Sequence, residues 1–230
     1  MLKQMLKSVL LLALLGFAGN AAVITNSGFE SVSSTVGFVN GLALNALAST
    51  QWDVYSAIPG WSATSGQGIE VQYGSVIAPH TGNFYVELEG DVPIGTPTNS
   101  TMQQSFALSA GNYMLSFWYH PRTNTVGDNT IDASLFPAGS PGSPLFTTQA
   151  AGISSSIPGW VQITQAFSVT TAGNYTLSFA AVGIDNGAGG FLDDISISSS
   201  GIGVIPEPST YALVGLGLLA AGLARRRFAR

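Results

Sequence analysis

The stretch "QQSFALSAGNYMLSFW", Gln103–Trp118, has a near copy later in the chain, "TQAFSVTTAGNYTLSFA", at Thr164–Ala180. Each copy reads as a strand, an Ala-Gly-Asn turn and a second strand, because Gly and Asn accept the positive φ angles of tight turns. We therefore predict two equivalent β-hairpins within one all-β fold.

The second strand of the first copy continues as "GNYMLSFWYH", in which apolar and polar residues alternate. Residues two apart share a face of a strand. One face carries Tyr113, Leu115, Phe117 and Tyr119, and the other carries Met114, Ser116, Trp118 and His120. The first face is typical of a core. The second is either another buried layer or a ligand surface.

Alternation dominates the chain between its two ends, and "LALNALA" (Leu42–Ala48) is the best candidate for a helix. "IPGW" occurs at Ile58–Trp61 and Ile157–Trp160, at unequal distances from the two hairpins, which argues against a tandem array. We predict that residues 23–200 form one antiparallel β-sandwich of two sheets. Residues 31–57 and 122–156 are predicted to be surface loops or an edge insertion.

The charge of the chain is unevenly distributed. Residues 22–208 hold one basic and all twelve acidic residues, a formal charge of −11, while the other six basic residues lie at the ends. So acidic a body excludes nucleic acid as a partner and disfavours anionic membrane surfaces. A neutral polymer, a divalent cation or a basic partner fits better. There is no Cys and hence no disulfide framework.

Residues 1–22 have the three parts of a secretory signal peptide. Lys3 and Lys7 supply the positive region, "SVLLLALLGFA" (Ser8–Ala18) the apolar region, and "GNAA" (Gly19–Ala22) the small residues at a cleavage site. The alternative is an uncleaved anchor helix, for which the apolar run is short.

The C-terminus divides into a linker, 201–210, and a segment of membrane-helix type, 211–230. Tyr211–Ala224 has 14 uncharged residues, a helix of roughly 21 Å, shorter than the hydrocarbon core of about 30 Å. A basic cluster follows and stays on the cytoplasmic side, which places the body outside the inner membrane. That cluster is Arg225, Arg226 and Arg227.

The order of these parts resembles the PEP-CTERM sorting signal of bacteria that have exopolysaccharide systems. The resemblance rests on Pro206, Glu207 and Pro208, the short apolar run and the arginines. It implies a transient stop in the inner membrane and cleavage near the Pro-Glu-Pro by an exosortase. A permanent single-span anchor is the alternative.

The body resembles the galactose-binding-like jelly rolls of extracellular carbohydrate-binding modules. The resemblance rests on the order of five motifs along the chain. They are "NSGFE" (26–30), "IPGW", "GNFYVELEG" (82–90), the two "AGNY" hairpins and "GGFLDDISI" (189–197). It implies neighbouring first and last strands whose carboxylates, with backbone carbonyls, hold a structural Ca²⁺. Extracellular polysaccharide is the partner that it implies.

Glu30, Asp193 and Asp194 are the predicted calcium ligands. Hard oxygen ligands, in a chain with no Cys and two His, favour calcium over zinc. Alternation would point Asp193 and Asp194 to opposite faces, so both need not bind. The alternative is that these carboxylates cap turns and accept hydrogen bonds from backbone amides.

Glu87 and Glu89 share a face of their predicted strand, about 6.5–7 Å apart. Paired carboxylates at such spacing serve glycosidases, but no other catalytic signature accompanies them, so we predict that the chain is not an enzyme. As alternatives to a catalytic role, Glu87 and Glu89 form a solvated strand face or accept hydrogen bonds from sugar hydroxyls.

Aromatic side chains with polar neighbours can bind sugars. The predicted ligand-binding residues are Tyr85, Glu87, Trp118, His120 and Arg122. A local pair of Arg122 with Asp128 or Asp132 is the alternative for that residue. Trp61 and Trp160, each behind Pro-Gly, are predicted to lie in the core.

These observations together predict a non-catalytic protein, exported across the bacterial inner membrane to the cell surface, outer membrane or extracellular matrix. It would bind or associate with polysaccharide there. A structural or adhesion protein without affinity for sugar is the alternative, and a glycan-active enzyme is the least favoured.

Overall fold

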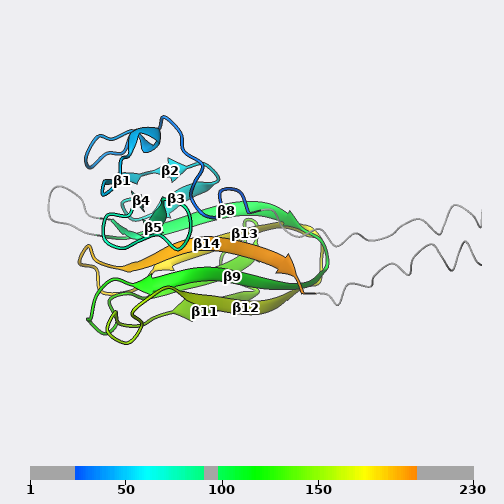
Figure 1. The fold of residues 1–230 in the computed structure, drawn as a ribbon. Coiled ribbons are helices and arrows are strands. Elements are labelled where there is room, and N and C mark those ends of the chain that lie inside the picture. Colours follow the sequence, from blue (N-terminus) through cyan, green and yellow to red (C-terminus); the bar gives the residue numbers. More distant parts are fainter. Residues whose placement is uncertain (1–23, 91–97, 201–230) are drawn as a thin grey trace, which may run out of the picture. The chain divides into compact units, whose positions relative to one another are not determined.

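The computed structural model describes residues 24–90 and 98–200 (Figure 1). The predicted signal peptide 1–22, the motif Pro206–Pro208, the apolar run 211–224 and the arginines 225–227 lie outside the described residues. Within the described ranges, no helix is long and apolar enough to cross a membrane.

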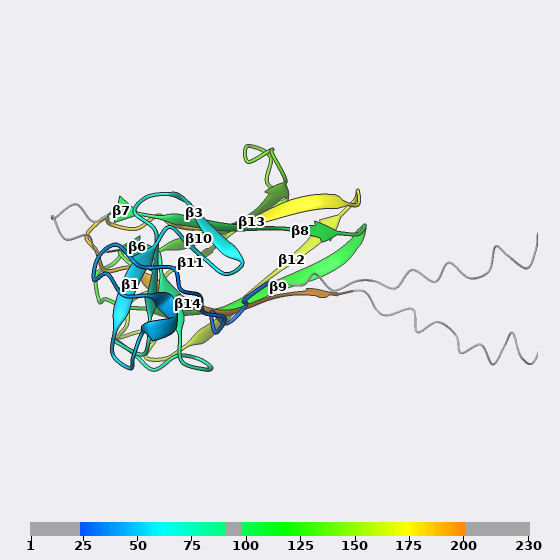
Figure 2. The same ribbon diagram turned by 90° about the horizontal axis from the view of Figure 1, so that it is seen from above.

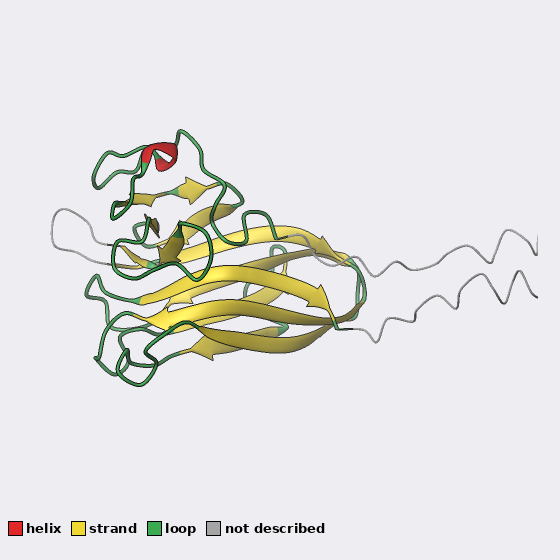
Figure 3. Cartoon of the chain, in the orientation of Figure 1, coloured by secondary structure: helices red, strands yellow, loops and turns green. Residues whose placement is uncertain are grey.

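The described chain is built of antiparallel strands, with one short 3-10 turn, η1 (Leu44–Ala46) (Figure 3). The first sheet has, in spatial order, β1 (Trp52–Tyr55), β4 (Ile69–Gln72), β5 (Tyr85–Glu87), β14 (Gly190–Ser199), β9 (Gly111–Pro121) and β12 (Val161–Val169). The second has β11 (Phe146–Ala150), β10 (Ile131–Pro137), β13 (Gly173–Ala181), β8 (Thr101–Leu108), β3 (Trp61–Ser65) and β2 (Ala57–Ile58). A small ribbon pairs β6 (Glu89–Gly90) with β7 (Thr98–Asn99). The predicted all-β, jelly-roll-type sandwich is confirmed.

The two copies of the repeated sequence are not hairpins, so that prediction was wrong. In each copy the chain leaves one sheet and enters the other: β8 and β13 belong to the second sheet, β9 and β12 to the first. The strands of one copy pair with those of the other, β8 with β13 and β9 with β12. We call β8–β9 and β12–β13 the twin arches; their turns lie at the same end of the sandwich (Figure 2).

A tyrosine closes each arch. The hydroxyl of Tyr113 donates to the carbonyl oxygen of Ser109 at 2.9 Å, and that of Tyr175 donates to Thr171 at 2.7 Å. Both bonds reach back four residues across the turn, as in the tyrosine corner of other β-sandwiches. The repeated Gly-Asn-Tyr therefore encodes a corner between sheets, and local alternation cannot distinguish such a corner from a hairpin.

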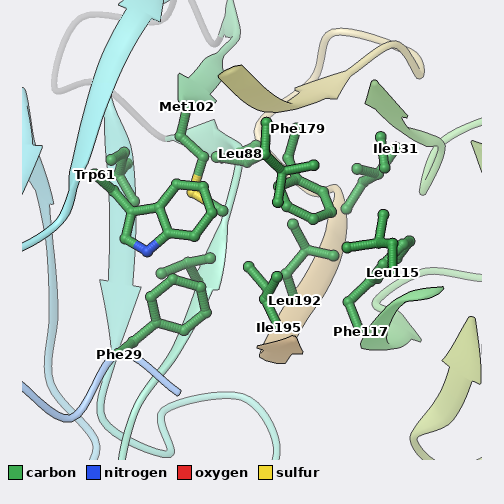
Figure 4. Packing of buried hydrophobic residues seen from close by; sticks show 14 of the residues in the cluster. Phe29, Trp61, Leu88, Met102, Leu115, Phe117, Ile131, Phe179, Leu192 and Ile195 are labelled. Atoms are coloured by element: carbon green, nitrogen blue, oxygen red, sulfur yellow. The ribbon is translucent and has the colours of Figure 1, made fainter. Parts of the chain in front are cut away.

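The core fills the space between the sheets, as the alternation of β9 predicted. Side chains from both sheets meet there, including Trp61, Met102, Leu115, Phe117, Phe179 and Leu192 (Figure 4). The core position of Trp61 is confirmed, with 1% of its surface exposed. Met114, Ser116 and Trp118 are half-buried on the opposite side of β9.

Two predicted loop regions contain regular structure. Residues 122–156 include β10 and β11, which pair and form one edge of the second sheet, so the edge-insertion interpretation is the correct one. Residues 31–57 include η1 and β1. The carboxylate of Asp53 fastens the loop before β1 by accepting hydrogen bonds from the backbone of Val39, Asn40 and Leu42.

Candidate functional site

The face of the first sheet that points away from the core, which we call the outer face, carries most of the predicted ligand residues. Strand register places Phe191 beside both Glu87 and His120. The next row has Asp193 beside Trp118. The structure therefore brings Tyr85, Glu87, Trp118 and His120 together on one face of three neighbouring strands, β5, β14 and β9.

Glu87 is fully buried and anchors a polar network. Both of its carboxylate oxygens lie 2.9 Å from Nη1 of Arg122. Gly189 donates its backbone N–H to Oε1 at 2.6 Å, and Gln72 donates its amide to Oε2 at 2.7 Å. Arg122 thus pairs with Glu87 and not with Asp128 or Asp132, so the alternative of a local pair was wrong.

The network holds more negative than positive charge. Glu70, itself buried, is the register partner of Glu87 and accepts a hydrogen bond from the same Gln72 amide at 2.7 Å. Burial, and next the charge of Glu70, raise the pKa of Glu87 well above its usual range, and Arg122 opposes the shift. Burial and the charge of Glu70 therefore disfavour the ionised form of Glu87, and Arg122 favours it.

Aromatic rings lie beside this network. The rings of His80 and Trp118 stack with centroids 3.7 Å apart. Trp160 packs edge-on against His80, Tyr85 and His120. It is half-buried on the outer face and donates its indole N–H to the carbonyl of Ala78, so the prediction that it lies in the core was wrong.

The predicted ligand residues differ in accessibility. The Tyr85 hydroxyl is buried, donates to Gln72 at 2.7 Å and accepts the backbone N–H groups of Val76 and Ile77. His120 is 9% exposed, and burial lowers its pKa. Trp118 and Arg122 are half-buried and reach the surface. A ligand on the outer face would therefore meet Trp118 and Arg122 first, with Tyr85, Glu87 and His120 beneath.

The three predicted calcium ligands all contact one segment, His80–Phe84. Glu30 lies in a turn region and accepts the N–H groups of Asn83 and Phe84 at 2.8 and 2.9 Å. Asp193 accepts the N–H of His80 at 3.0 Å, and Asp194 bonds the His80 ring at 2.6 Å.

Asp193 and Asp194 reach the same residue because the strand is irregular there. The register of β14 shifts between Asp193 and Ser196, and Asp194 has a φ of 43°. Such a bulge re-aims side chains, so the expectation of opposite faces was wrong. Burial, and next the charge of Asp194, raise the pKa of Asp193 to about 7.

The donor set of these three carboxylates suits calcium by type, because all are hard oxygen ligands. Their contacts also agree with the alternative that they bind backbone amides. Among residues 24–90 and 98–200, no three His, Asp or Glu side chains gather closely enough to hold a metal by themselves. Sequence reasoning missed His80 and Thr81, which no motif marks but which these carboxylates bind.

Comparison with known proteins identifies a sorting signal. Residues 204–227 match the PEP-CTERM protein-sorting motif, which indicates export across the inner membrane and a surface-associated location. The chain is therefore an exported protein with a β-sandwich body. No curated protein matches it.

Several solved structures are similar to this chain at low identity. The module TmCBM61 in complex with β-1,4-galactotriose is 18% identical with a TM-score of 0.43, over 61% of this chain and 88% of that one. Arabinose-bound MgGH51 α-L-arabinofuranosidase is 14% identical with a TM-score of 0.44, over 78% of this chain and 27% of that one. The module CBM6cm-2 of Cellvibrio mixtus lichenase 5A in complex with cellotriose is 15% identical with a TM-score of 0.39, over 60% of this chain and 92% of that one.

Proposed function

We propose that the exported sandwich binds polysaccharide, without catalysis, on its outer face around Trp118. The observation that carries the proposal is the half-buried indole of Trp118, which lies beside the hydroxyl and amide groups of Ser116, Ser196 and Gln162. An aromatic face stacks on the apolar side of a sugar ring, while polar neighbours bond its hydroxyls. The charge of −11 on residues 22–208 favours a neutral polymer over an acidic one.

The polar groups beside Trp118 are arranged as cross-strand pairs. The hydroxyls of Ser116 and Ser196 lie 3.1 Å apart, and the amide of Gln162 donates to Ser116 at 3.3 Å. Ser196 and Gln162 are exposed, so they can exchange these bonds for bonds to sugar hydroxyls. The surface continues from the indole along β9, β12 and β14, which suits an extended chain.

Two buried carboxylates support the non-catalytic part of the proposal. Glu87 and Glu89 are both fully buried, and Glu87 is paired with Arg122. A glycosidase needs both carboxyl groups beside the scissile bond. These two support loops beneath the surface. Loss of polysaccharide hydrolysis in Glu87→Gln with unchanged stability would contradict this part of the proposal.

The test of binding is retention on neutral polysaccharides by affinity electrophoresis of the purified chain. We expect Trp118→Ala to weaken retention about tenfold, the effect of losing one aromatic stacking contact of about 1–1.5 kcal/mol. Phe38→Ala is the matched control, because Phe38 is 47% exposed and lies beside β1, at the far edge of the sheet. If no polysaccharide retains the natural chain, the adhesion or structural alternative replaces this proposal.

We also propose that an exosortase cleaves near Pro206–Pro208 after residues 211–224 pause in the inner membrane. The matched motif supports this step. The intact mass of the exported protein tests it, and a mass that includes Arg230 would contradict cleavage.

Structural calcium at Glu30, Asp193 and Asp194 is the third part of the proposal. A cation there would relieve the repulsion between Asp193 and Asp194, and it would fasten the segment His80–Phe84. Since a ligand of the folded state raises stability by mass action, EDTA is expected to lower the melting temperature of the natural chain. A smaller response in Asp193→Asn than in the natural chain would assign the difference to this site, and an EDTA-insensitive natural chain would remove the site.

A further inference from the structure

Glu89 is a buried carboxylate that is only half satisfied. It is fully buried, and Oε1 accepts the backbone N–H groups of Asn186 and Gly187, the latter at 2.9 Å. Oε2 has no hydrogen-bond donor among the described residues. A buried charged oxygen without a partner is among the most unfavourable groups in a folded protein, so Oε2 indicates a missing ligand.

A second buried oxygen without a donor lies on the neighbouring strand. Asn99 is the register partner of Glu89 in the ribbon β6–β7, and its Oδ1 is also buried without a donor among the described residues. Its amide nitrogen donates to the carbonyl of Gly183 at 2.9 Å, which fixes Oδ1 as an acceptor. Paired residues of an antiparallel ribbon have Cβ atoms about 4.5–5.5 Å apart. Both side chains reach the loop 183–189.

The surroundings add further negative charge. Asp128 is 2% exposed and accepts a hydrogen bond from the Asn186 side chain at 2.6 Å, and so contacts the residue that also binds Glu89. Burial raises the pKa of Glu89, backbone N–H groups of the loop oppose this shift, and the charge of Asp128 adds to it. Arg122, the one basic residue between 22 and 208, is paired with Glu87. Among residues 24–90 and 98–200, no ion pair of Glu89 or Asp128 with a basic side chain is present.

We propose that a calcium ion binds between Glu89 Oε2 and Asn99 Oδ1, under the loop 183–189. One carboxylate and one amide oxygen, with main-chain or water oxygens completing the shell, are ligands that calcium accepts. The donor set has no nitrogen or sulfur, which disfavours zinc. Magnesium demands a near-ideal octahedron, whereas calcium accepts irregular sets of oxygen ligands. This site differs in every side-chain ligand from the one proposed at Glu30, Asp193 and Asp194. It stands whether or not the outer face binds polysaccharide.

The ion would fasten the loop 183–189 to the ribbon. That loop donates Gly189 N–H to Glu87 and accepts Arg122 at Gly187, 3.2 Å away. Calcium at Glu89 would therefore order the loop that covers the buried network of the outer face.

The experiment measures the melting temperature of the full chain in mild detergent, with calcium chloride or with EDTA. It compares the natural chain, two single variants and their double variant. Glu89→Gln keeps the shape but presents an amide N–H₂ at the position of Oε2, which can donate to Asn99. Asp193→Asn removes the response of the other proposed site. At about ten times the dissociation constant, calcium at one site raises the melting temperature by about 3–6 °C. We expect Asp193→Asn to keep a rise of this size and the double variant to lose it.

A proton or a water molecule at Oε2 would give the opposite result. The calcium-induced rise of the melting temperature in Glu89→Gln would then equal that of the natural chain. That outcome overturns the site. Asn99→Asp is a second variant that keeps the test decisive if Glu89→Gln does not fold. It adds a carboxylate ligand, so we expect a lower melting temperature in EDTA and a larger rise with calcium; an unchanged or smaller rise counts against the proposal.

Discussion

The two ends of the sandwich are stabilised in different ways. At the arch end, each twin arch is closed by one tyrosine hydroxyl that reaches back four residues. At the opposite end, buried carboxylates hold loops that are about a hundred residues away in sequence, such as Gly187 by Glu89 and His80 by Asp193. The arch end therefore depends on local bonds, and the loop end on buried charge.

The difference has a consequence for stability. A neutral hydrogen bond between a side chain and the backbone contributes about 1 kcal/mol. A buried charge that loses its partner destabilises by about 3–5 kcal/mol. We therefore expect substitutions at the loop end to be the more damaging and to depend on pH, while those at the arch end are milder and independent of pH.

The largest effect is expected for Arg122→Met. This change removes the guanidinium but keeps much of the apolar stem, and leaves Glu87 buried without its cation. We expect a loss of about 3 kcal/mol in the free energy of unfolding at neutral pH, measured by urea denaturation.

The pH dependence of that loss follows from the raised pKa of Glu87. A carboxyl group whose pKa is higher in the folded than in the unfolded state takes up a proton on folding, so its penalty is present above the folded pKa and disappears below it. In Arg122→Met the pKa rises further, so the deficit should shrink as the pH falls from neutral. Glu87→Gln in the same background should remove the pH dependence, and a deficit of constant size would contradict a buried charge.

A smaller effect is expected for Asp193→Ala. The side chain accepts N–H groups from His80, Thr81 and Asp194, which the substitution would leave without this acceptor. We expect a loss of about 2 kcal/mol and faster hydrogen exchange at His80 and Thr81. Asp132→Ala is the control, because Asp132 is half-buried on β10 and accepts only the Gln149 side chain among the described bonds. Equal losses in the two variants would contradict the proposed role of Asp193.

The contrast between local and long-range contacts also explains which features could be predicted from the sequence. The alternation in "GNYMLSFWYH" identified the core face of β9 correctly, because strand periodicity is local. The sheet assignment of β8 and β9 could not be predicted, because the same turn residues serve a hairpin and an arch. A bulge turned Asp194 toward His80 against the alternation. The Glu87–Arg122 pair joins residues 35 apart through the order of the strands, which composition and spacing do not specify.

The smallest effect is expected at the arch end, for Tyr113→Phe and Tyr175→Phe. Each removes one hydroxyl and keeps the ring, which is buried in both cases. We expect about 1 kcal/mol for each, with no change between pH 5 and 8, because the lost bond joins two neutral groups. The arches pair with each other through β8–β13 and β9–β12, so the double variant measures their coupling. Additive losses would mean that each tyrosine closes its own turn. A double loss well beyond the sum would mean that the paired arches form one cooperative unit, and the corner would then depend on long-range pairing as the loop end does.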